Sequence, residues 1–231
     1  MGIKTLLLTG ANNHDWKRSA PYCRDLMHGT GKFDVRLTED PSSALADNRT
    51  ASDFDLFFVD YNGPEWDDQA KANFVAAVRA GTGVCILHAA DNAFDGWVEY
   101  EEMCALLWRE GTSHGKYHKF DVKVTDPDHP ITRGLGPVVK DHPDELYHAL
   151  VHMHKAPYDT LATAYSSPES GGTGKDEPVL IVRTYGEGRV FHCILGHVWE
   201  GGGMDTFENP DFQSLLLRGC EWAATGDVTI I

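Results

Sequence analysis

Short apolar runs alternate with helical patterns through the first half of this chain, and this alternation limits the folds that it can adopt. The apolar runs cover residues 3–8, 33–37, 56–59 and 84–87. Helical patterns cover residues 21–28 and 65–80, and the second repeats apolar residues at every fourth position on one face. Strands and helices that alternate with short connections are typical of a doubly wound parallel sheet with helices on both faces.

The second half of the chain is richer in β-strand patterns. Residues 120–125 alternate apolar with polar side chains, which predicts an edge or antiparallel strand. Further strand-like runs cover residues 161–165, 179–185 and 189–195. Gly186-Glu187-Gly188 predicts a hairpin turn, the Ser/Gly-rich stretch 166–174 a surface loop, and Pro210 the start of a final helix. No repeat or long linker divides the chain, so we expect one α/β domain over residues 1–231 with an antiparallel extension of its sheet.

Composition excludes several classes of protein. The 231 residues carry 20 Lys and Arg against 35 Asp and Glu, a formal charge of −15, with 42% hydrophobic residues. These values are those of an ordinary globular chain. An acidic chain is repelled by nucleic-acid backbones and anionic membranes, so we expect neither as a partner. The oligomeric state is left open, a homo-oligomer among the options.

The cysteines and the N-terminus bear on the compartment. Five cysteines include no CxxC pair, and Cys85 and Cys193 lie inside apolar runs, which predicts buried free thiols in a reducing compartment. The first apolar run is too short for a signal peptide, and no run approaches the roughly 18 residues of a membrane span. We therefore expect a cytoplasmic protein.

Three histidines follow three predicted strands, among twelve in the chain. His14 lies in the loop after the first strand, His88 directly after the strand 84–87, and His197 after the strand 189–195. Ligands bind at the carboxyl ends of strands in an open parallel sheet, so we expect these side chains to meet there. Imidazole suits both proton transfer near neutral pH and metal binding. Each histidine alone also fits a structural role, at a loop, a turn or a strand end.

Other polar residues offer weaker signals. The segment Asp144-Glu145-Leu146-Tyr147 follows Pro143 and could begin an element, or its carboxylates could supply a base or a metal ligand. The other histidines fit structural positions: a helix end for His28, turns for His129-Pro130 and His142-Pro143, and a strand core for His192. His114 and His118 are four apart, but Gly115 and the following strand pattern argue against a zinc-binding helix. No GxGxxG, Walker or GxSxG motif occurs, so no nucleotide cofactor is expected.

An ordered set of short motifs resembles the ThuA-like, trehalose-utilisation family. The motifs are Gly83-Val84-Cys85-Ile86-Leu87-His88, His129-Pro130-Ile131-Thr132 with Gly134-Leu135, Asp144-Glu145-Leu146-Tyr147, Tyr185-Gly186-Glu187-Gly188-Arg189-Val190 and Leu195-Gly196-His197. Asn12-Asn13-His14-Asp15-Trp16 also fits a branch of that family. The resemblance covers nearly the whole chain. It implies the flavodoxin-like three-layer α/β/α sandwich of the class I glutamine amidotransferases.

The resemblance also implies what the site does not do. The amidotransferases carry a nucleophilic cysteine at the strand-to-helix elbow, where this chain has His88. Cys85 lies three residues back, and alternation along a strand directs it into the sheet packing. A glutaminase would lack its nucleophile. Glutaminase activity is therefore not expected.

The family's association with trehalose implies an enzyme of carbohydrate catabolism that acts on 3-keto-glycosides or related oxidised sugars. Hydrolysis, elimination or isomerisation through an enolate would need a base, an acid and a stabiliser of the enolate oxygen. We expect His88 and His197 to form the central pair, with His14 and Glu145 as metal ligands or proton-transfer groups. Whether these four side chains bind a divalent metal such as zinc or act without one is left open.

Further residues are candidates for sugar binding. We expect hydrogen bonds to sugar hydroxyls from Asn12, Asn13, Asp91 and Asn92. We expect stacking on a pyranose face by Trp16, Trp97 and Tyr147. His118 is a lesser candidate. The alternative is a non-catalytic sugar-binding or partner protein that retains an amidotransferase-like fold.

Overall fold

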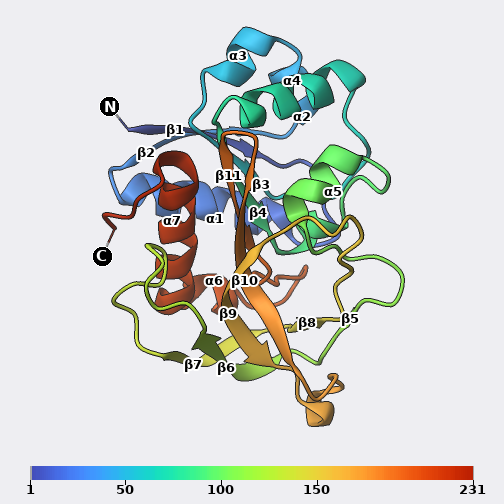
Figure 1. Ribbon diagram of the computed structural model, residues 1–231, viewed down its shortest axis with the longest axis vertical. Coiled ribbons are helices and arrows are strands. Elements are labelled where there is room, and N and C mark those ends of the chain that lie inside the picture. The colour runs from blue at the N-terminus through green and yellow to red at the C-terminus, as the bar shows by residue number, and fades with distance from the viewer. Residues whose placement is uncertain (1, 231) are drawn as a thin grey trace.

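A computed structural model describes residues 2–230 of the chain and contains a nine-stranded sheet in the order β2-β1-β3-β4-β11-β10-β9-β6-β7 (Figure 1). The first five strands of this order run parallel to one another. Their bounds are β2 Phe33–Thr38, β1 Ile3–Leu8, β3 Leu56–Val59, β4 Gly83–Leu87 and β11 Gly188–Cys193. The predicted doubly wound arrangement is confirmed.

The remaining strands are antiparallel and extend the sheet beyond β11. They are β10 Asp176–Tyr185, β9 Asp159–Tyr165, β6 His118–Val124 and β7 Val138–Asp144. A separate two-stranded sheet pairs β5 Ser113–His114 with β8 Tyr147–His148. The predicted antiparallel extension is confirmed, and the turn at residues 186–187 joins β10 to β11 as a hairpin.

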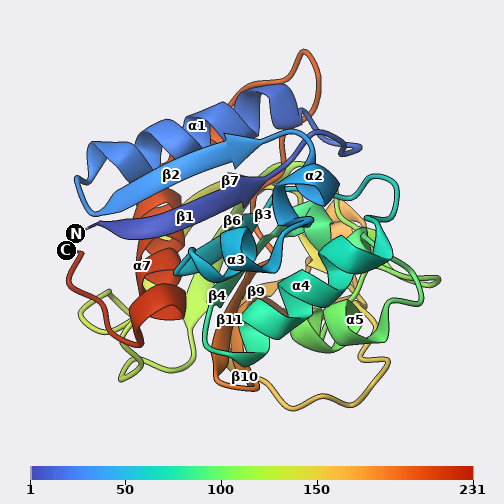
Figure 2. The same ribbon diagram turned by 90° about the horizontal axis from the view of Figure 1, so that it is seen from above.

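Helices cover both faces of the parallel strands, which completes the three layers (Figures 1 and 2). On one face lie α1 Trp16–Gly29 and α7 Pro210–Thr225; on the other lie α2 Pro41–Leu45, α3 Asn48–Ser52, α4 Asp68–Arg79 and α5 Val98–Cys104. Short elements complete the chain: the 3₁₀ turns η1 His88–Asn92 and η2 Pro168–Ser170, and α6 Asp205–Glu208.

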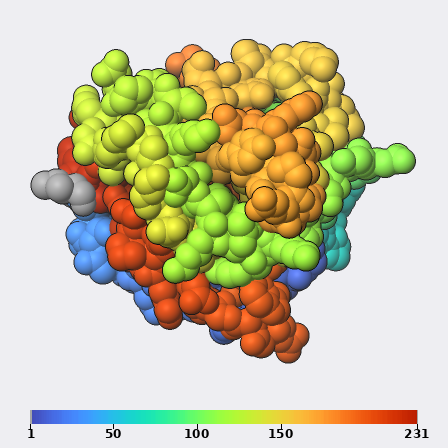
Figure 3. Space-filling model, turned by 90° about the horizontal axis from the view of Figure 1, so that it is seen from below, coloured from blue at the N-terminus to red at the C-terminus, as the bar shows by residue number. Residues whose placement is uncertain are grey.

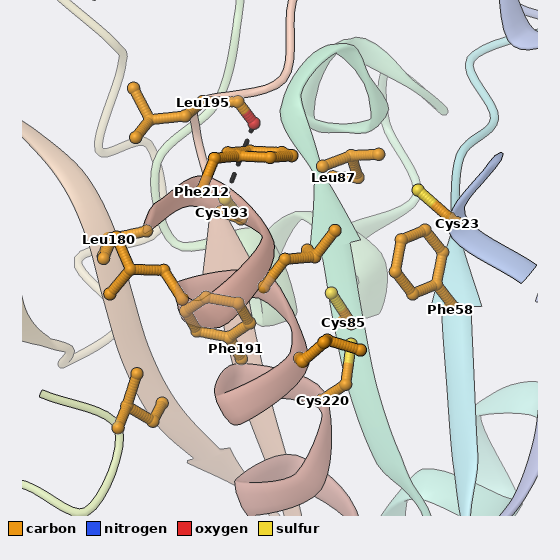
Figure 4. Close-up of a cluster of buried hydrophobic side chains, with 14 of the residues drawn as sticks. Cys23, Phe58, Cys85, Leu87, Leu180, Phe191, Cys193, Leu195, Phe212 and Cys220 are labelled. Atoms are coloured by element: carbon orange, nitrogen blue, oxygen red, sulfur yellow. Dashed lines mark hydrogen bonds between the residues drawn. The ribbon is translucent and has the colours of Figure 1, made fainter. Parts of the chain in front are cut away.

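Strands β3 and β4 are buried along their whole length, as expected of strands covered on both faces. Cys85 points to the face under α1 and α7, among Cys23, Phe58 and Cys220, whereas the next residue, Ile86, packs on the opposite face (Figure 4). All five thiols are free and buried. Burial raises the pKa of the Cys85 thiol well above its usual value, so it is an inert thiol at neutral pH.

Three local predictions were wrong. Helix α1 begins at Trp16, not at Pro21, which is accommodated inside the helix. His142-Pro143 is no turn: both residues lie in β7, an edge strand, where a proline breaks no ladder on its free side. Asp144 is the last residue of the same strand, so it does not begin an element. The predicted place of His28 at a helix end is correct: it lies in the last turn of α1, where its imidazole accepts a hydrogen bond from the Val35 N–H (3.0 Å).

The packing of α7 on β11 predicts a sensitive position at Gly219. A Cβ atom there would lie 2.1 Å from the ring of Phe191, which is fully buried. We expect Gly219→Ala to lower the free energy of unfolding by about 1–3 kcal/mol through overpacking, measured by urea denaturation. Gly29→Ala is the control, because a Cβ there meets nothing within 4 Å. Equal stability of the two variants would contradict this account of the interface.

Candidate active site

The three strand-end histidines meet at the carboxyl edge of the parallel strands. One ring nitrogen from each of His14, His88 and His197 lies within 4.8 Å of the others. Their ring centroids are 4.7 to 5.5 Å apart. They stand beside a cavity of about 460 Å³, with His14 and His197 in its wall. The expected convergence of the three strand ends is therefore present.

His88 occupies the strand-to-helix elbow in an unusual backbone conformation. Its φ of +45° places it in the left-handed region, which is uncommon for a residue with a side chain. Its Nδ1–H donates to the carbonyl of Ile194 (2.6 Å), so Nε2 carries the lone pair. That Nε2 is buried and has no hydrogen-bond partner among the described residues. A buried nitrogen of this kind is poised to receive a ligand.

Neighbouring amides set the tautomer of His14. Asn62 Nδ2 donates to the carbonyl of Ala89 (3.2 Å) and to Asn13 Oδ1 (2.6 Å), while Asn62 Oδ1 accepts from the Asn13 N–H (3.0 Å). Asn13 Oδ1 is therefore an acceptor, and His14 Nδ1 must donate to it (2.9 Å). The lone pair of His14 is then on Nε2, which faces His197 Nδ1 at 2.9 Å.

Asp144 anchors the third histidine. The N–H groups of Gly196 (2.8 Å), His197 (3.1 Å) and Glu145 (2.7 Å) donate to its carboxylate, as does His142 Nε2 (3.1 Å). Burial alone would raise the pKa of Asp144, but these donors outweigh it and lower that pKa. The ionised carboxylate thus ties the end of β7 to the loop that follows β11.

Glu145 supplies a carboxylate inside the cavity. Its Oε2 lies 3.2 Å from His197 Nδ1 and its Oε1 lies 3.3 Å from His114 Nδ1. Burial raises the pKa of this carboxyl. A carboxyl group with a raised pKa is better matched to proton transfer near neutral pH than an ordinary glutamate.

All three imidazoles are neutral at pH 7. Burial, followed by the repulsion of His88 and His197, lowers the pKa of His14 to about 2. Burial also lowers the pKa of His88 to about 4 and that of His197 below its ordinary value. Neutral imidazoles keep their lone pairs, which is the form that binds metal ions.

These residues fit a divalent cation. Three neutral imidazoles converge, and the buried lone pair of His88 has no hydrogen-bond donor within residues 2–230. Imidazole nitrogens are suitable ligands for zinc and similar ions, and Glu145 is close enough to His197 to serve as a further oxygen ligand or as the group that moves a proton.

The predicted sugar-binding residues divide into two groups. Asn13, Asn92 and Tyr147 line the cavity, and Tyr147 stacks on His88 at 4.1 Å between centroids. Asn12 supports the loop from behind, where it donates to Asp60 (2.9 Å) and accepts from the His14 N–H (3.0 Å). The four other predicted residues also lie outside the cavity wall.

Four residues predicted for sugar binding do not line the cavity. Asp91 is fully buried, with Oδ2 3.7 Å from His192 Nε2, because the η1 turn directs it away from the strand ends. Trp97 packs among the aromatic side chains between α4 and α5. Trp16 begins α1, and His118 faces a different depression beside Asp205.

Sequence reasoning missed several residues of the site. The cavity is also lined by Trp108, His114, Tyr117 and Trp199. Trp199 follows His197 by two residues and could have been included on that basis. The other three lie in a segment with no strand-end pattern, and only the pairing of β5 with β8 brings His114 beside Tyr147. Asn62 supports the site without any motif of its own, and Asp144, which belongs to a quoted motif, acts as an anchor for backbone N–H groups.

The fold and the site define an α/β sandwich with a histidine-lined cavity at the carboxyl edge of its sheet. A family model described as ThuA, trehalose utilisation, matches residues 4–223, and the chain belongs to this family. Membership indicates a carbohydrate-related role. No curated protein matches the chain significantly.

Solved structures support the assignment. A ThuA-like protein from Parabacteroides merdae is 35% identical with a TM-score of 0.89, over 99% of this chain and 92% of that one. A ThuA-like protein from Bacteroides uniformis is 15% identical with a TM-score of 0.70, over 98% and 93%. A cytoplasmic protein from Salmonella typhimurium, 12% identical with a TM-score of 0.65 over 95% and 98%, shares the fold. Within residues 2–230, none of the helices has the length and apolar character required to span a membrane.

The amide contacts predict one tautomer for His14. Asn62→Ala removes the donor that holds Asn13 Oδ1 toward His14, so the Asn13 amide is free to turn and we expect the Nδ1–H form of His14 to lose its dominance. Imidazole ¹⁵N chemical shifts measure the tautomer ratio directly. Asn92→Ala, at a residue that lines the cavity without a hydrogen bond to His14, is the matched control. An unchanged spectrum in Asn62→Ala would refute the relay.

The low pKa of His88 predicts a pH-dependent contribution to stability. The unfolded chain binds a proton at this residue below about pH 6.5, whereas the folded chain does not until about pH 4. The free energy of unfolding therefore decreases as the pH is lowered through that window. The slope is about 1.4 kcal/mol per pH unit. We expect His88→Asn, which tolerates a positive φ, to flatten the slope of unfolding free energy by that amount.

Urea unfolding of both proteins between pH 7 and pH 4.5 measures this difference. The comparison cancels the contributions of the titrating groups that do not interact with His88. Parallel pH profiles for the two proteins would show that His88 is not held neutral in the folded chain.

Proposed function

We propose that this chain is an enzyme of carbohydrate catabolism that acts on 3-keto-glycosides. The observation that carries the proposal is the convergence of three neutral imidazoles, with the unpaired buried Nε2 of His88, beside a carboxyl group of raised pKa. The cavity wall is aromatic and polar but carries no lysine or arginine, which suits a neutral sugar better than a phosphorylated one.

The chemistry follows from the ketone. A carbonyl at C3 acidifies the hydrogen at C2, because removal of that proton gives an enolate. Collapse of the enolate expels the oxygen substituent at C1 as the C1–O bond breaks, and a proton is returned to the leaving oxygen. Addition of water to the resulting enone completes a net hydrolysis, whereas release of the enone makes the enzyme a lyase. Reprotonation elsewhere would make it an isomerase.

The geometry suggests how the residues divide these tasks. We assign the proton transfer to Glu145, whose carboxylate takes the proton from C2 and returns one to the leaving oxygen. His14, His88 and His197 would hold a divalent cation, which when bound would draw electron density from the C3 carbonyl as a Lewis acid. His197 Nδ1 lies next to both His14 Nε2 and Glu145 Oε2, so its ring links the imidazole cluster to the carboxylate.

Other expectations accompany the proposal. The five buried thiols fit a reducing compartment such as the cytoplasm. The acidic charge of −15 argues against nucleic acids and anionic membranes as partners. We therefore expect a small sugar as the ligand, and no nucleotide cofactor.

The proposal is tested by incubating the protein with 3-keto-trehalose in the presence of zinc, manganese or magnesium and measuring the release of glucose. We expect His88→Asn and Glu145→Gln each to reduce kcat/KM by at least about 100-fold, because the first removes a ligand of the cation and the second removes the proton-transfer group. Circular dichroism checks that both variants fold. His152→Asn, a histidine that bonds to Ala156 away from the cavity, should retain activity.

The same assay separates the enzyme from a binding protein. A wild-type protein that binds the sugar but releases no product with any of the three metals would contradict the proposal. It would favour a non-catalytic sugar-binding role instead.

A further inference from the structure

Trp199 is a large apolar side chain that stays exposed. It retains 42% of its accessible surface and lines the mouth of the cavity. The orange-red segment near residue 200 reaches the surface beside the green segment near residue 117 (Figure 3). An indole exposed to this extent contributes little to the core. Its placement at a cavity therefore calls for a role in binding.

The indole is held in one position although it is exposed. It lies over Gly202, where a Cβ atom would come within 2.4 Å of the ring. Arg18 donates to the carbonyls of Trp199 (2.7 Å) and Gly202 (2.8 Å), and its Nε donates to Asp15 (2.6 Å). The turn that carries the indole is thus tied to the loop that carries His14. An aromatic surface fixed before binding loses little entropy when a ligand arrives.

The cavity wall holds two aromatic pairs, one that adjoins His88 and one that adjoins His197. The inner pair is Tyr147, which stacks on His88 (4.1 Å), and Trp108, whose ring centroid lies 4.5 Å from that of Tyr147. The outer pair is Trp199 and Tyr117, whose rings are 5.2 Å apart. Trp199 also lies 5.2 Å from the ring of His197. A ligand that contacts both pairs would extend from the surroundings of His88 to those of His197.

We propose that the outer pair forms a second sugar subsite, which binds the departing ring of a disaccharide while the inner pair flanks the ring that reacts. This assignment rests on the proposed function, because it takes the bond between the two rings to be the one that is cleaved. The faces of a pyranose present C–H groups that pack on aromatic rings. The cavity volume of about 460 Å³ falls in the range that accommodates ligands larger than one sugar ring.

Calorimetric titration with 3-keto-trehalose and with 3-keto-glucose tests the subsite, with Glu145→Gln introduced into every protein compared, including the one otherwise wild-type, so that the disaccharide binds without being cleaved. We expect the wild-type protein to bind the disaccharide about tenfold more tightly than the monosaccharide. Trp199→Ala should abolish that preference and leave the affinity for 3-keto-glucose within twofold. Trp199→Phe, which keeps an aromatic face, should restore most of the preference.

One further variant tests whether the position of the indole matters as well as its presence, and another serves as a control. Gly202→Ala displaces the ring without removing it, so we expect it to weaken disaccharide binding as Trp199→Ala does. Tyr165→Ala, an aromatic residue that is 47% exposed outside the cavity, should leave both affinities unchanged.

The outcomes distinguish the subsite from the function on which it rests. If the wild-type protein binds both sugars equally and Trp199→Ala changes neither affinity, the subsite is overturned while the proposed function stands. If the wild-type protein binds neither sugar, both proposals fail. If Trp199→Ala weakens the binding of both sugars to the same extent, the indole contacts the ring that reacts, and the second subsite is overturned.

Discussion

The site depends on one buried carboxylate. Asp144 is fully buried, and such a charge is tolerated only when hydrogen-bond donors surround it. Three backbone N–H groups and His142 provide those donors. Two of the N–H groups belong to Gly196 and His197, so ionisation of Asp144 and the position of His197 are linked. The same carboxylate orients Glu145 through its backbone, and Glu145 is the one carboxylate that residues 2–230 place in the cavity wall.

The elbow after β4 carries an imidazole and no nucleophile. His88 has a positive φ there, and its side chain faces the strand ends. Burial makes the imidazole neutral, so it offers a lone pair and no nucleophilic thiolate. Cys85, within the preceding strand, cannot replace it, because it lies under α1 and α7.

The sequence allowed the parallel half of the sheet to be predicted, because buried parallel strands are uniformly apolar and each is followed by a distinct helix. It also allowed His14, His88 and His197 to be grouped, since strand polarity alone brings their loops to one edge. It did not allow β7 to be predicted, because Pro143 indicates a turn unless the strand is known to lie at an edge. The sequence gives no sign of Asn62, and none of the anchoring role of Asp144, because both roles arise from backbone partners far away in the chain. Trp97 and Asp91 were misplaced because residues next to a site in sequence can point into the opposite layer.

The contact between His14 and His197 has a consequence for how the molecule forms. The two residues are separated by 183 positions, and their strands lie on either side of β3 and β4 in the sheet. The complete histidine cluster therefore cannot assemble until the N-terminal strand and the C-terminal hairpin have both docked on the same central strands. Contacts over such distances along the chain are slow to close. The complete cluster is a reporter of complete folding, and a chain that has lost either end can form no more than two of its three members.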